Sequence, residues 1–138
     1  MKIAFVCNGN SFKSLIGERF GNEFNDGIFE IYSAGTNPAE KINEIGEKIM
    51  KSKGYSMKGY HPSSMDKLPE KVDILVKMGC DIDCPIHLAD KVVNFGLENV
   101  KDQEKCVEMI ELKVKKLLED LSQWLLYHEI NILEDSLG

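Results

Sequence analysis

The sequence predicts an α/β protein built on a small doubly wound parallel sheet of four strands, with helices on both faces. Short apolar runs alternate with amphipathic stretches along the chain, and this alternation is typical of a parallel sheet with crossover helices. The 138 residues suffice for one domain with a hydrophobic core, so we expect a single domain over residues 1–138. Right-handed crossovers leave few arrangements for four strands, and we favour the order 2-1-3-4.

Apolar runs define the predicted strands, and apolar periodicity defines the predicted helices. The strands cover residues 2–6, 28–36, 72–78 and 91–95. The helices cover residues 12–25, 39–53 and 101–127, with a short one near 64–69. In the first helix Ile16, Phe20 and Phe24 recur at a step of four, which places them on one face. Residues 128–138 either extend the last helix or pack separately, and we expect the apolar segment "WLLYHEINIL" to cover the core rather than to pair with another chain.

Composition narrows the expected partners and compartment. The net charge of −6 and the pI near 5.1 argue against a nucleic acid or an anionic membrane as the main partner. No apolar run reaches the roughly 18 residues that span a bilayer, and the sequence enters a strand at once without a signal-peptide pattern. We therefore expect a cytoplasmic protein with reduced cysteines, in which spaced cysteines indicate catalysis, redox exchange or metal. The cysteines are Cys7, Cys80, Cys84 and Cys106.

Cys7 ends the first predicted strand and opens a turn rich in Gly, Asn and Ser, "CNGNSFKS". Such a turn before a helix points several backbone N–H groups at one place and forms an anion site. A cysteine at its base is expected to have a lowered pKa and to attack a bound oxyanion as a thiolate, with Ser14 donating to the sulfur. The alternative is a small buried cysteine at a strand end. The predicted oxyanion-binding residues are Asn8, Gly9, Asn10, Ser11, Phe12 and Lys13.

Cys80 and Cys84 lie four residues apart in "GCDIDCP", directly after the third predicted strand. Two accessible thiols at this spacing suit thiol–disulfide exchange, and we favour a redox pair. A metal site is the first alternative, because Cys80, Cys84 and His87 have ligand-like spacing and Cys7 or His61 can supply a fourth ligand. Two unrelated structural cysteines are the second alternative. By contrast, the cysteine inside the last predicted helix, at position 106, is expected only to pack.

The motifs together resemble a known family. "VCNGNSFKS", with Glu18 and with "SAGT" at 33–36, resembles the low-molecular-weight protein tyrosine phosphatase superfamily, whose loop reads Cys, five residues, Arg, then Ser or Thr. "MGCDIDCP" at 78–85 resembles the thioredoxin-coupled arsenate reductase branch, which carries a Cys pair followed by Pro. The resemblance covers about residues 1–120 and implies a phosphotyrosine protein phosphatase I-like fold.

The resemblance implies a three-thiol relay. Arsenate or phosphate would bind in the loop, and Cys7 would form an adduct with arsenic. Cys80 would then attack the Cys7 sulfur and release arsenite, and Cys84 would attack Cys80. A Cys80–Cys84 disulfide would remain for a thioredoxin-like reductant. No metal or organic cofactor is required by this relay.

The resemblance also implies residues that order the loop. Asn10, Glu18 and Ser33 match positions that do so in the reductases, in some members by binding a potassium ion. We therefore expect no cofactor, and a structural potassium ion is the one ion that the resemblance allows. Ser14 matches the residue that stabilises the thiolate.

The sequence departs from the family pattern at two positions. Lys13 stands where the loop signature has Arg, which keeps the charge but loses the planar bidentate fork. The family places an acidic Asp-Pro after the fourth strand, and here Asn99 aligns best, although Glu98 or Asp102 can stand in for it. Loss of that acid harms a phosphatase more than a reductase, because arsenate loses oxygen more easily than a phosphate ester loses its leaving group.

Three functions remain open from the sequence. An arsenate reductase needs all three of Cys7, Cys80 and Cys84. A tyrosine phosphatase needs only Cys7, and a non-catalytic oxyanion-binding or redox-sensing protein would bind without turnover. We favour the reductase.

Overall fold

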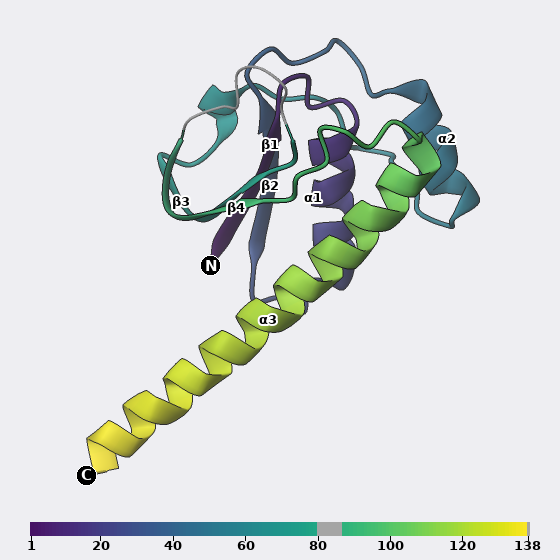
Figure 1. Cartoon of the computed structure of the whole chain (residues 1–138). Coiled ribbons are helices and arrows are strands. Elements are labelled where there is room, and N and C mark those ends of the chain that lie inside the picture. Colours follow the sequence, from purple (N-terminus) through teal and green to yellow (C-terminus); the bar gives the residue numbers. More distant parts are fainter. Residues whose placement is uncertain (80–86, 138) are drawn as a thin grey trace.

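The computed structural model describes residues 1–79 and 87–137, and the side chains of residues 1–79 and 87–128. Its sheet contains β1 (Lys2–Cys7), β2 (Glu30–Gly35), β3 (Lys71–Lys77) and β4 (Leu88–Asn94). All neighbouring strands are parallel, and their order is β2-β1-β3-β4 (Figure 1). The predicted fold class and strand order are confirmed.

Three α-helices and one 3-10 helix accompany the sheet. They are α1 (Lys13–Phe24), α2 (Glu44–Ser52), α3 (Gln103–Leu137) and the 3-10 helix η1 (Met65–Lys67). The second helix is predicted from residue 39, but α2 begins only at Glu44, because residues 36–43 donate backbone N–H groups to the loop that follows β1. The last strand begins earlier than predicted, since Leu88 already pairs with Lys71 of β3.

The sheet has a different apolar cluster on each face. α1 and α3 lie together on one face, and the larger cluster joins them to alternate residues of β1 and β3, including Ile3, Phe5 and Val76. The smaller cluster, on the opposite face, contains Ala4 and Val6 and is closed by the region around η1. Burying a large apolar side chain contributes about 1.5–3 kcal/mol to the stability of the fold. Since side chains on both faces of β1 are buried, they fix β1 in the sheet and with it the loop that follows β1.

The last helix is longer than predicted. α3 runs past the sheet, and its C-terminal part extends away from the rest of the molecule (Figure 1). The prediction that "WLLYHEINIL" covers the core is confirmed for Leu125, which packs against the core cluster. It is wrong for the side chains beside it, because Trp124 is 49% exposed, Leu126 58% and Tyr127 66%. No helix in the described part of the chain is both long and apolar enough to cross a membrane.

Candidate active site

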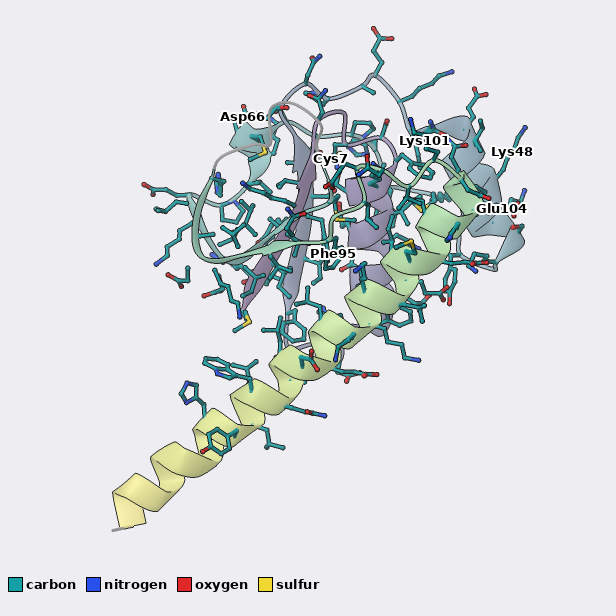
Figure 2. The ribbon with its side chains drawn as sticks, viewed as in Figure 1. Cys7, Lys48, Asp66, Phe95, Lys101 and Glu104 are labelled. Atoms are coloured by element: carbon teal, nitrogen blue, oxygen red, sulfur yellow. The ribbon has the colours of Figure 1, made fainter. Side chains whose placement is uncertain are left out.

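Cys7 lies at the carboxyl end of β1, level with Gly35 at the end of β2. Figure 2 shows it at this edge of the sheet, where β1 leads into the loop before α1. Gly35 lets the loop approach β2 closely, because a Cβ atom there would lie 2.4 Å from the Asn8 carbonyl oxygen. The sequence prediction that Cys7 opens a loop between a strand and a helix is confirmed.

The backbone carbonyls of this loop accept hydrogen bonds from the segment that follows β2. The segment 36–43 donates one N–H group to each of four loop carbonyls: Thr36 to Cys7 at 3.3 Å, Asn37 to Asn8, Ala39 to Gly9 and Asn43 to Ser11 at 2.9 Å each. A peptide unit whose carbonyl faces this segment has its N–H turned the opposite way. The N–H groups of these peptide units therefore point away from the segment 36–43, without help from a bound anion.

Asn10 fixes the loop from within. Its φ of 48° lies in the left-handed region, which Asn tolerates better than most residues. The side chain is 1% exposed, and its Nδ2 donates to Ser14 Oγ at 2.8 Å while its Oδ1 accepts from the Ser63 N–H at 2.7 Å. Since the Ser14 hydroxyl accepts from Asn10, its own proton stays available for another partner.

The start of α1 adds positive potential at the same place. Lys13 is the first residue of the helix, and its predecessor Phe12 makes no side-chain capping bond, so N–H groups of the first turn remain available to an anion. Lys13 Nζ donates to the Leu97 carbonyl at 3.1 Å, and the same carbonyl accepts the Val100 N–H at 3.2 Å. Lys13 therefore ties the loop to the turn after β4.

Two of the predicted loop-ordering residues are in contact with each other. Ser33 Oγ donates to Glu18 Oε1 beneath the loop, and burial raises the pKa of Glu18 above its ordinary value of 4.5, while this hydrogen bond and His61 oppose the rise. The third residue, Asn10, bonds Ser14 and Ser63 instead of these two. The structure thus forms a Glu18–Ser33 pair and a separate Asn10 network.

The candidates for a general acid lie in or next to the turn that Lys13 holds. Glu98 and Asn99 are exposed there. Asp102 uses its Oδ1 to accept the Lys105 N–H at the start of α3, at 3.2 Å, which is a capping role. Cys106 is fully buried in the next turn, and burial raises the pKa of its thiol, although the nearby Lys13 charge opposes this. The expectation that Cys106 packs is confirmed.

The predicted redox pair, Cys80 and Cys84, lies outside the described residues. His87 is described, and its Nε2 lies 2.7 Å from the Pro69 carbonyl oxygen, to which it donates. Among the described side chains, those of residues 1–79 and 87–128, no group of three or more His, Cys, Asp or Glu is arranged to hold a metal ion.

Sequence reasoning missed the segment 36–43 as part of the site. The sequence predicts most of this segment as helix, although Pro38 favours an extended residue before it and therefore a break in the helix. Thr36 adds a side-chain bond from its Oγ1 to Asn8 Oδ1 at 2.9 Å. The Ser63 N–H was also missed, because nothing in the sequence indicates a bond across 53 residues.

Comparison with known proteins agrees with this geometry. The family model described as low molecular weight phosphotyrosine protein phosphatase matches residues 2–96. An arsenate reductase of Halalkalibacterium halodurans is 29% identical over 102 residues, which cover 70% of this chain and 72% of the relative.

Solved structures agree as well. An arsenate reductase of Archaeoglobus fulgidus superposes with a TM-score of 0.71 at 26% identity, covering 85% of this chain and 98% of that one. A thioredoxin-dependent arsenate reductase of Corynebacterium glutamicum superposes with a TM-score of 0.75 at 21% identity, covering 88% of this chain but only 62% of that longer one.

The matched residues include all four strands and the whole Cys7 loop. The resemblance inferred from the loop and cysteine motifs is confirmed at the level of the family and of its arsenate reductase relatives. This chain therefore belongs to the low molecular weight phosphotyrosine protein phosphatase family of enzymes.

Proposed function

We propose that this protein reduces arsenate to arsenite with Cys7 as the attacking thiolate. The observation that carries the proposal is the loop after β1, whose carbonyls accept N–H groups from the segment 36–43, so that the N–H groups of the same trans peptides point away from that segment. A tetrahedral oxyanion suits such a loop because each oxygen can accept N–H bonds. The cysteine pair in "GCDIDCP" and the arsenate reductases among the relatives support reduction as the outcome.

The proposed reaction is a series of thiolate displacements. Cys7 Sγ bonds to arsenic, and one arsenate oxygen leaves as water after protonation by solvent. Cys80 then attacks Cys7 Sγ, and the electron pair of the sulfur–arsenic bond stays on arsenic, which departs as arsenite. Cys84 attacks Cys80, frees Cys7 and leaves a Cys80–Cys84 disulfide. We propose a thioredoxin-like dithiol as the reductant of that disulfide.

Lys13 and Ser14 have supporting roles in this proposal. Lys13 contributes a point charge to the oxyanion, and two of its three N–H donors remain after the bond to Leu97. Ser14 has its hydroxyl proton available for the Cys7 thiolate, because its oxygen already accepts from Asn10. Each interaction lowers the energy of an anionic state within the loop.

The polar residues around the loop favour a reductase over a phosphatase. Of the candidates near the family's general-acid position, Asp102 caps α3 and Asn99 has no acidic proton. Glu98, the remaining acid, is exposed to solvent. An ester leaving group requires protonation, whereas the thiol relay does not require an acid at this position. A phosphatase activity would therefore be slow in this protein.

A structural potassium ion is proposed only as a supporting feature. The contacting pair Glu18 and Ser33 supplies oxygen donors, which are the ligands that hard cations prefer. A bound cation would offset the burial that raises the pKa of Glu18. It would steady the loop and take no part in the electron transfer.

The test is arsenite release by purified protein supplied with arsenate, thioredoxin, thioredoxin reductase and NADPH. Turnover that disappears in both Cys7→Ser and Cys84→Ser is expected. If hydrolysis of p-nitrophenyl phosphate is fast and arsenite release is absent, the protein is a phosphatase. If both are absent while phosphate still shields Cys7 from alkylation, the loop only binds oxyanions. Either result would contradict the proposal.

A further inference from the structure

We propose that the first turn of α2 is a positioning element for the oxyanion loop, acting on Phe12 through Gly46 and on Ser11 through Asn43. The proposal rests on the proposed oxyanion site and adds a second helix to it. In this proposal neither Asn43 nor Gly46 would contact the anion. They set the backbone of Ser11 and Phe12, the two residues that lead into α1.

Asn43 connects the oxyanion loop to the start of α2. Its backbone N–H donates to the Ser11 carbonyl at 2.9 Å, and its side-chain Oδ1 caps α2 by accepting the Gly46 N–H at 3.0 Å. One residue therefore begins α2 and holds the loop. A shift of the α2 start would move the Ser11 carbonyl with it.

Gly46 and the Phe12 ring occupy the same space. A Cβ atom on Gly46 would lie 2.5 Å from Phe12 Cδ2 and 2.8 Å from Cε2, which is closer than any relaxed contact. Gly46 is buried, and the partly buried Phe12 ring packs against the core cluster, so the ring can move only away from both. A glycine inside a helix lowers helix stability by about 1 kcal/mol relative to alanine. The position of the Phe12 ring explains why glycine is found at position 46, because an alanine there would clash with it.

Phe12 links the contact with Gly46 to Lys13 at the end of the loop. It is the residue before α1, with φ −133° and ψ −86°, and Lys13 follows it directly. A displaced ring would rotate this peptide, its N–H group and the Lys13 stem together. The ring is thus placed to set both the last N–H groups of the loop and the cation beside them.

The experiment measures how phosphate protects Cys7 from iodoacetamide, read as modification of the Cys7 peptide by mass spectrometry. Gly46→Ala is expected to weaken phosphate protection at least about tenfold, because small misplacements of positioning groups have large effects. The double variant Gly46→Ala with Phe12→Leu is expected to return to within about threefold of Phe12→Leu alone. Lys48→Ala is the control on the outer side of α2, away from Cys7 (Figure 2), and should bind as the unaltered protein does.

The outcomes separate this inference from the proposed function. Equal protection in Gly46→Ala and Lys48→Ala would overturn the positioning role, and so would a double variant as weak as Gly46→Ala. If Gly46→Ala lacks native circular dichroism, the double variant decides: native structure with restored protection supports the proposal, and failure to fold contradicts it. If phosphate does not protect even the unaltered protein, the oxyanion site itself is wrong, whatever α2 does.

Discussion

Replacing Asn10 with alanine should destabilise the protein strongly, because three effects act at one buried position. The substitution removes the bond to Ser14 and leaves the Ser63 N–H without its acceptor. An unsatisfied buried group costs about 1–3 kcal/mol. Alanine at φ 48° adds about 1 kcal/mol of backbone strain. The lost bond to Ser14 adds about 0.5–1.5 kcal/mol. We expect the free energy of unfolding to fall by roughly 3–5 kcal/mol, which lowers Tm by about 9–15 °C in a chain of this size.

The assay is urea and thermal unfolding followed by circular dichroism, with Asn8→Ala as the control. Asn8 is exposed, and within the described part of the chain its side chain accepts only from Thr36, so its loss should cost about 0.5 kcal/mol or less. Asn10→Gly relieves the strain without restoring the bonds and should recover about 1 kcal/mol of the loss. If Asn10→Ala unfolds within about 0.5 kcal/mol of the unaltered protein, the argument that Asn10 holds the loop is refuted.

Three further predictions concern the charges and thiols around the loop. Lys13→Arg should tighten phosphate binding in the Cys7 protection assay because Arg offers a bidentate fork, whereas Lys13→Met, which also loses the bond to Leu97, should weaken it at least about tenfold; equal affinities would contradict a role for this side chain. Because burial raises the pKa of Glu18 in the folded protein, the folded state holds the proton more tightly than the unfolded state, and the free energy of unfolding falls as pH rises above 4.5. Unfolding titrations of Glu18→Gln from about pH 4 to pH 7 should lack this fall. A pH profile that is the same in Glu18→Gln and in the unaltered protein would show that Glu18 does not titrate in this range. Cys106→Ala should lose about 1 kcal/mol of stability while arsenite release continues, and abolished release would instead make Cys106 part of the relay.

The strand order and the Cys7 loop were predictable because both depend on local patterns. Apolar runs located the strands, and the right-handed crossover rule restricted their order. The Gly/Asn/Ser turn after an apolar strand located the loop, and Asn10 suits its left-handed backbone. These features are written within a few consecutive residues.

The remainder depends on contacts between distant segments. The start of α2 at Glu44 follows from bonds that residues 36–43 make to the loop. The tie between Lys13 and Leu97 spans 84 residues and explains where the unusual lysine points when the family's arginine is absent. The exposure of Trp124 follows from the length of α3 relative to the sheet, while apolar composition alone favoured burial.

The relay itself is tested most directly by mapping disulfides by mass spectrometry before and after anaerobic exposure to arsenate, with Cys7→Ser as the control. We predict that a Cys80–Cys84 disulfide forms only when arsenate and Cys7 are both present, together with release of arsenite. Thiols that stay reduced in arsenate, or a Cys80–Cys84 disulfide that forms equally in Cys7→Ser, would contradict a reduction that begins at Cys7.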